Sequence, residues 1–222
     1  MHRPLYTCTR SPRPLELTGK LTDPLWQTAE TARLTDAVTG QPCTLTTTAR
    51  LLYTATHLYV AFHCEDDYVW GTLTEHDSAI YTEECVEVFI SPSGKMRQYY
   101  EINVSPLNTV FDAFILNGGT PGGPRNMIGF HEYTCAGLET AVCVDGELGV
   151  HGGARGWSAE YAIPFSALIG ADDLAPSTGD AWLMNLYRID AQAPERQTFL
   201  AWACVDRIDF HQPWLFGTLR FG

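Results

Sequence analysis

The sequence lacks any long hydrophobic run. Among its 222 residues no stretch approaches the roughly 20 apolar residues that a membrane-spanning helix requires. Its opening stretch, MHRPLYTCTRSPRPLEL, also lacks the apolar central segment of a secretory signal peptide. As it stands, the sequence therefore predicts a cytoplasmic protein, or a secreted one if a signal peptide has been removed.

Positive charge is scarce. The chain has 14 Lys plus Arg against 26 Asp plus Glu, which gives a net charge of -12. Such a surface repels nucleic acid and anionic membranes. The charge balance therefore argues against both as partners and favours a neutral molecule or a cation.

Paired cysteines are also lacking. The number of cysteines is odd, seven, and no CxxC motif occurs. This argues against a disulfide framework and against a zinc site of closely spaced thiolates. Several cysteines, Cys64 and Cys85 among them, stand where a strand would accept any small hydrophobic residue. We expect free, buried thiols.

The pattern that is present has a period of two. Alternating segments separated by Gly, Pro and Asp predict an all-β, antiparallel β-sandwich with one or two short helices. We expect one domain over residues 1–222, with 1–13 as an extended N-terminal segment and short helices near 24–31 and 164–168. The expected strands are 47–53, 57–64, 84–90, 98–104, 110–116, 137–144, 156–163, 181–189, 198–205 and 217–221.

Carboxylates interrupt two neighbouring strands. In YTEECVEVFIS, Glu87 lies on the face opposite Val86 and Val88. In QYYEINVSP, Glu101 and Asn103 share one face. Consecutive strands usually pair, so we expect a polar strip across one sheet, and such a strip is typical of a ligand site. Two further acidic residues, Glu83 and Glu84, are expected to be solvated or to bind cations.

Six segments occur in an order that resembles the family 9 carbohydrate-binding modules, over about residues 14–222. This resemblance implies a sandwich related to a jelly roll that binds the end of an oligo- or polysaccharide without catalysis and serves carbohydrate catabolism. The segments are ARLLYTATHLYVAFHCEDDYVW, YTEECVEVFISP, YYEINVSPLNTVFD, GWSAEYAIPF, LMNLYRID and AWACVDRIDFHQPWLFGTLRF.

The resemblance also implies a binding site. Two family tryptophans that clamp the terminal sugar correspond to Tyr81 and Phe210, the family's carboxylate to Glu87, and an arginine to Arg196. An aromatic ring offers an apolar platform to the face of a sugar, whereas charged groups bind the hydroxyls at its rim. The polar strips of the strands add two candidates, Arg188 and Asn103.

Two other functions remain open. Glu87 and Glu101 would suit the acid and base of a glycan-processing enzyme. A haem-binding electron-transfer sandwich would need Met and His ligands, for which the chain offers Met96, Met127, Met184, His63, His131 and His211.

No cofactor is certain from the sequence, but structural calcium is a candidate. Hard oxygen ligands on loops suit this ion, and Glu65, Asp66 and Asp67 follow a predicted strand. A second acidic pair occurs at 172–173. Neither has the spacing of an EF-hand.

Overall fold

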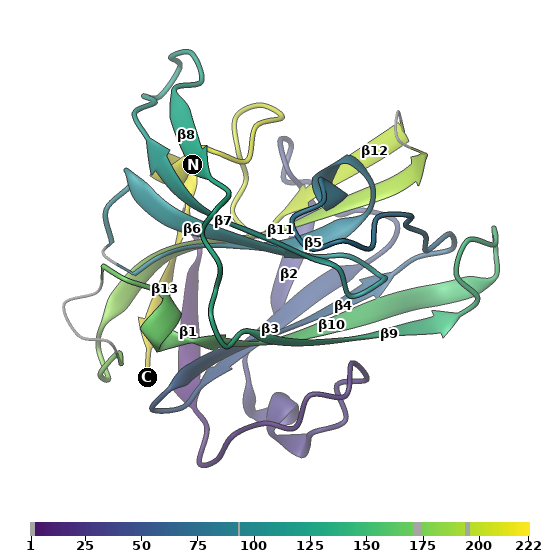
Figure 1. The fold of residues 1–222 in the computed structure, drawn as a ribbon, viewed down its shortest axis with the longest axis horizontal. Helices are drawn as coiled ribbons and strands as arrows, with labels where there is room; N and C mark the ends of the chain where they lie inside the picture. Colours follow the sequence, from purple (N-terminus) through teal and green to yellow (C-terminus); the bar gives the residue numbers. More distant parts are fainter. Residues whose placement is uncertain (1–2, 93, 171–174, 194–195) are drawn as a thin grey trace.

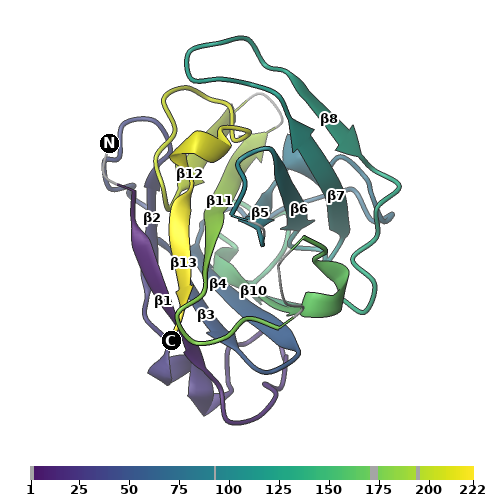
Figure 2. The same ribbon diagram turned by 90° about the vertical axis from the view of Figure 1, so that its left-hand side faces the viewer.

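The strands form two packed layers (Figures 1 and 2). The computed structural model describes residues 3–92, 94–170, 175–193 and 196–222. Within these ranges all helices are single 3₁₀ turns, and none is long and apolar enough to cross a membrane. The expected all-β sandwich is confirmed.

The first layer carries the candidate site. Its central strands lie in the order β8-β7-β6-β5-β11, and β12 and β13 both pair with the long strand β11. Every ladder among these strands is antiparallel. The bounds are β5 Cys85–Ser91, β6 Gln98–Val104, β7 Val110–Asn117, β8 Met127–Phe130, β11 Ala181–Ala193, β12 Arg196–Ala201 and β13 Gly217–Phe221.

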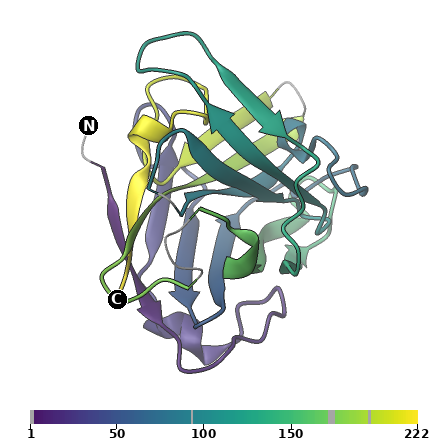
Figure 3. The same ribbon diagram turned by 60° about the vertical axis from the view of Figure 1, so that its left-hand side comes forward.

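The second layer has the order β9-β10-β4-β3-β2. Two strands connect the layers at one side of the sandwich (Figure 3): β2 pairs with β12 and β3, and β1 pairs in parallel with β13 and β3. The bounds are β1 Leu5–Arg10, β2 Ala32–Asp36, β3 Thr47–Tyr53, β4 His57–Glu65, β9 Glu139–Gly146 and β10 Ala154–Pro164.

Every expected strand overlaps an observed one, but three observed strands were not predicted. Strand β1 lies in the segment expected to be merely extended, and β2 and β8 are only five and four residues long. The expected helices are shorter 3₁₀ turns: η1 is Pro24–Thr28, and the Asp23 carboxylate caps it by accepting from the Leu25 amide at 3.0 Å. The others are η2 Ile80–Thr82, η3 Phe165–Ala167 and η4 Pro213–Leu215.

Apolar residues pack on both faces of the first layer. Even-numbered residues of β5, such as Val86 and Val88, point between the layers into the main core. Odd-numbered residues, such as Phe89, point outward into a second cluster with Tyr99 and Tyr187. Loops cover part of this outer cluster, and the candidate site lies there.

All seven cysteines are free thiols. Cys64 and Cys85 are fully buried in strands, and burial raises the pKa of the Cys64 thiol to about 12. A buried thiol that stays protonated reacts slowly. These cysteines therefore serve as small core residues, as their strand positions indicated.

Candidate functional site

A cleft of about 350 Å³ opens on the outer face of the first layer. Strands β5, β6 and β7 supply its floor, η2 and the segment 208–211 supply two sides, and the loop between β7 and β8 reaches its rim. The lining is Tyr81, Glu87, Phe89, Glu101, Phe111, Ile115, Arg125, Met127, His131, Ile189, Phe199, Ile208, Asp209, Phe210 and His211.

Strand register brings the two carboxylates of the floor together. Strands β5 and β6 pair as expected, with Glu87 opposite Asn103 and Phe89 opposite Glu101. Because side chains alternate along each strand, all four point to the same face. Glu87 and Glu101 are thus diagonal neighbours in the floor of the cleft.

One aromatic side of the cleft is rigidly supported. The Phe210 ring stacks on Tyr187 with a centroid distance of 3.9 Å and an interplanar angle of 8°. The Tyr187 hydroxyl donates to the Phe210 carbonyl at 2.9 Å, and Phe199 contacts the same ring edge-on. Only 9% of Phe210 is exposed, so this ring is mainly part of the outer cluster.

A second aromatic group of the lining is more accessible. Tyr81 in η2 is 39% exposed, and its ring meets Phe111 edge-on at 5.2 Å. Tyr81 is therefore the more exposed of the two rings, since Phe210 is only 9% exposed.

The buried carboxyl groups of the floor hold protons unusually tightly. Burial and the neighbouring Glu101 raise the pKa of Glu87 well above its usual range. Burial also raises the pKa of Glu101 to about 7, although the Asn103 amide donates to it at 2.9 Å. Near neutral pH the pair therefore keeps at least one proton. Glu87 can donate as well as accept a hydrogen bond, whereas the sequence suggested an acceptor alone.

His211 is a neutral member of the site. Burial and the charge of Arg125 lower the pKa of the imidazole to about 3. Its Nδ1 lies 2.8 Å from the Tyr99 hydroxyl, and its Nε2 lies 3.7 Å from Glu101 Oε2. His211 thus offers a polar but uncharged edge to the cleft.

Charged groups at the rim were missed by sequence reasoning. Arg125 belongs to the Gly-rich stretch NGGTPGGPRN, which carries no binding motif, and it pairs with Asp209 at 4.0 Å. Both residues lie in sequence outside the alternating strand segments that indicated Glu87. Their only sequence signal is that Asp209 adjoins Phe210.

The structure brings three of the six predicted binding residues into the lining of the cleft: Tyr81, Glu87 and Phe210. Asn103 is fully buried and reaches the site only through its hydrogen bond to Glu101. Arg196 is exposed at the start of β12 and is not part of the lining.

Arg188 has a different role from the predicted one. It pairs with Val86 across β11 and β5, and therefore points between the layers. Its guanidinium is fully buried and forms ion pairs with Asp66 at 2.5 Å and Glu84 at 3.2 Å. Arg188 is a core residue whose charge compensates buried carboxylates.

The two acidic residues just before β5, Glu83 and Glu84, are buried rather than solvated. Glu84 accepts from the Trp157 indole at 2.7 Å and from Arg188. Glu83 accepts from the Thr72 amide at 2.8 Å. Both carboxylates are therefore used inside the protein.

The expected calcium ligands do not converge. The carboxylate of Glu65 accepts from the Thr46 amide at 2.8 Å, Asp66 is held by Arg188, and Asp67 is exposed. Asp66 does lie near Glu84 and Asp190, but the guanidinium occupies the position that a cation would need. The acidic pair at 172–173 lies outside the described residues.

Half of the residues considered for haem lie in the lining of the cleft and half lie elsewhere. Met127, His131 and His211 line the cleft, Met184 is buried in the main core, and Met96 and His63 are exposed. Trp70 and Trp214 are half-buried and do not belong to the lining.

The chain is thus a β-sandwich with a cleft on the outer face of one sheet, lined by aromatic and carboxyl groups, and such a lining is typical of small-ligand sites. The chain belongs to carbohydrate-binding family 9, whose model matches residues 40–221. The expected family is confirmed.

Relatives of known structure share the whole fold. A Bacteroides uniformis protein described as a candidate carbohydrate-binding protein has a TM-score of 0.76 and 18% identity, with full coverage of both chains. A family 9 module from Caldicellulosiruptor kristjanssonii, in complex with cellotriose, has a TM-score of 0.66 and 14% identity, and the match covers 98% of this chain and 93% of that one. In complex with glucose, a module of this family and organism has a TM-score of 0.67 and 14% identity, with 100% and 96% coverage.

A relative by sequence is an "Extracellular protein" of Arthroderma benhamiae. It is 26% identical over 173 residues, which are 74% of this chain and 73% of the relative.

Proposed function

We propose that this protein is a non-catalytic module that binds the terminal sugar of a carbohydrate chain in the cleft. The observation that carries the proposal is the combination of one accessible ring, Tyr81, with the buried carboxyl pair Glu87 and Glu101 in a single lining. A pyranose has apolar faces and a polar rim, and this lining offers a partner to each.

The arrangement would fix both the position and the orientation of the sugar. The Tyr81 ring stacks on one sugar face, while Glu101 accepts from a hydroxyl and Glu87, carrying a proton, donates or accepts. Arg125 and Asp209 lie at the rim, where further hydroxyls arrive. Hydrogen bonds to charged groups contribute about 1.5–3 kcal/mol each.

The size of the cleft favours a chain end over an internal segment. Its volume of about 350 Å³ is near the lower limit of roughly 300–1,000 Å³ for small-molecule sites. One or two sugar rings fit such a volume. The solved family 9 modules in complex with glucose and cellotriose support glucose-containing ligands.

Calorimetry with glucose, cellotriose and xylo-oligosaccharides tests this proposal, with and without calcium. We expect saturable binding of an oligosaccharide and loss of that binding when its reducing end is converted to an open-chain alditol or its other end is blocked. If both end-modified forms bound with the affinity of the unmodified oligosaccharide, recognition of an end would be contradicted. Absence of binding across a glycan array would contradict carbohydrate binding itself.

The carboxyl pair also favours a second candidate function, glycan hydrolysis. Two carboxyl groups with raised pKa values in one cleft match the requirements of an acid and a base. Prolonged incubation with the bound oligosaccharide, followed by product analysis, separates the two functions. Hydrolysis that is lost in Glu101→Gln would favour the enzyme, and an intact ligand would favour the binding module.

A further inference from the structure

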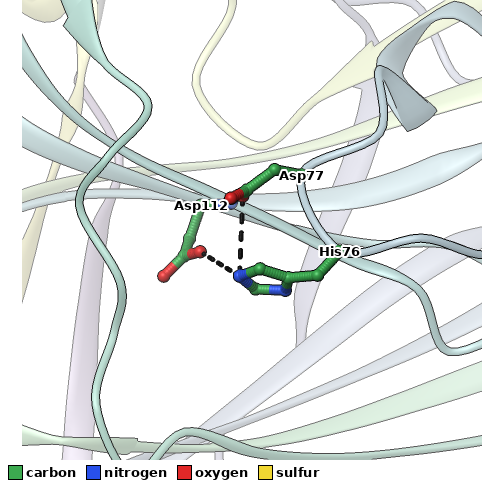
Figure 4. A group of neighbouring side chains, drawn as sticks. All are labelled: His76, Asp77 and Asp112. Atoms are coloured by element: carbon green, nitrogen blue, oxygen red, sulfur yellow. Dashed lines mark hydrogen bonds and ion pairs between the residues drawn. The ribbon is translucent and has the colours of Figure 1, made fainter.

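A second group of polar side chains lies beside the cleft but outside it. His76 and Asp77 stand in the segment that connects β4 to β5, and Asp112 stands in β7. Figure 4 shows both carboxylates directed at one atom, the imidazole Nε2. The distances from that nitrogen are 3.2 Å to Asp112 Oδ1 and 3.6 Å to Asp77 Oδ1.

Asp112 is the unusual member of this group. Its side chain is 1% exposed, and burial raises the pKa of its carboxyl group. The Cys135 amide donates to Oδ2, but Oδ1 accepts no hydrogen bond from any described residue. A buried carboxylate oxygen is costly unless it is compensated, and this one faces the ring nitrogen of the half-exposed His76 at 3.2 Å.

We propose that His76, Asp77 and Asp112 bind a divalent transition-metal ion, of which zinc is the best-fitting example. The three donor atoms all lie within 4.8 Å of one another. In a tetrahedral zinc site with bonds of about 2.0–2.2 Å, neighbouring ligand atoms are about 3.3–3.6 Å apart. The two distances from His76 Nε2 are close to that separation, so little movement is needed.

The donor set selects the class of metal. One imidazole nitrogen and two carboxylate oxygens suit zinc and its neighbours. Calcium prefers six to eight oxygen ligands, and this group supplies an imidazole instead of the extra oxygens. With three protein ligands, a tetrahedral ion would have a fourth position left for water.

The other acidic group of the described residues provides a contrast. Asp66, Glu84 and Asp190 also have the spacing of metal ligands. There the buried guanidinium of Arg188 already supplies the positive charge. No Lys or Arg makes an ion pair with Asp77 or Asp112 among the described residues.

The site is placed to fix one side of the cleft. Asp77 lies four residues before Tyr81 in the same connecting segment, and its amide donates to the Val110 carbonyl at 2.9 Å. Phe111, next to Asp112, contacts the Tyr81 ring. A bound ion would therefore join the segment that carries Tyr81 to β7. That this link would improve sugar binding rests on the proposed function. The proposal that these three residues bind a metal ion does not.

Metal binding is measured on the tag-free, chelator-treated protein with zinc chloride alone. We expect one equivalent to bind to the parent chain in calorimetry, and His76→Gln to weaken this binding at least about tenfold, since even loss of outer-shell partners costs about 10–100-fold. His76 is half exposed, so this variant should keep the parent melting temperature. His63→Gln is the matched control, because His63 is exposed and belongs to no such ligand group of the described residues.

Cobalt(II) absorption distinguishes this site from the free cysteines. We expect a spectrum without thiolate-to-cobalt charge transfer that His76→Gln removes and His63→Gln keeps. Hydrogen exchange of the amides at 77–82 should slow with zinc in the parent chain and not in His76→Gln. Equal zinc binding by the parent and His76→Gln, a thiolate spectrum, or binding of calcium alone would overturn the proposal.

Discussion

Phe210 lies flat against Tyr187, with ring centroids 3.9 Å apart and planes within 8° of each other. One face of Phe210 is therefore covered by the protein itself, and 9% of the residue is exposed. The two aromatic residues that the family resemblance assigned to a sugar clamp thus differ in exposure. Tyr81 is available to a ligand, whereas Phe210 mainly supports the cleft.

Replacing Tyr81 with Ala should weaken sugar binding about three- to tenfold, because an aromatic contact adds roughly 0.5–1.5 kcal/mol beyond area burial. Tyr81→Trp should strengthen binding by enlarging the platform. Thermal melting should change little for either, since Tyr81 is 39% exposed. Phe130→Ala is the control: Phe130 is 40% exposed but lies outside the cleft lining. Equal losses of affinity in Tyr81→Ala and Phe130→Ala would contradict the assignment.

Phe210→Ala should act first on stability. Loss of a packed aromatic side chain costs about 3–5 kcal/mol, and this one supports Tyr187 and Phe199. Urea unfolding should show this loss without ligand. Unchanged stability together with abolished sugar binding would instead identify Phe210 as an exposed platform.

The carboxyl pair should make stability depend on pH. The pKa of Glu101 is about 7 in the folded protein against 4.5 when unperturbed, so the folded state binds the proton more tightly. Stability from this group is present below about pH 4.5 and is lost as the pH rises to about 7. This loss amounts to roughly 3 kcal/mol. Glu101→Gln should flatten the decline in unfolding free energy over this range, and an equally steep decline would contradict the shift.

Arg188→Met should destabilise the fold by about 3–5 kcal/mol, because it leaves Asp66 and Glu84 buried without their counter-charge. Arg196→Met, at an exposed position, should change stability by less than about 0.5 kcal/mol. Chemical unfolding of both variants tests the contrast. If Arg188→Met lost sugar binding while its stability stayed unchanged, Arg188 would belong to the binding site instead.

Sequence periodicity determined most of the strands and the orientation of their side chains. Strands β3, β6 and β13 have the predicted bounds, because alternation with a period of two is a local property. The same alternation placed Glu87 opposite the apolar face of β5 and joined it to Glu101 and Asn103. Strands β1 and β2 were missed because they form by pairing with β13 and β12, which lie far away in the sequence. Strand β8 was missed because it is only four residues long.

Only the tertiary structure decided what each face meets. The register between β5 and β11 sets Tyr187 opposite Glu87 and Arg188 opposite Val86, and this puts Tyr187 under the cleft and Arg188 in the core. Likewise, His76 and Asp112 are 36 positions apart in the chain and meet through the packing of a loop on β7. A sequence specifies which side chains share a strand face, but burial, and with it charge and accessibility, depends on long-range register and packing.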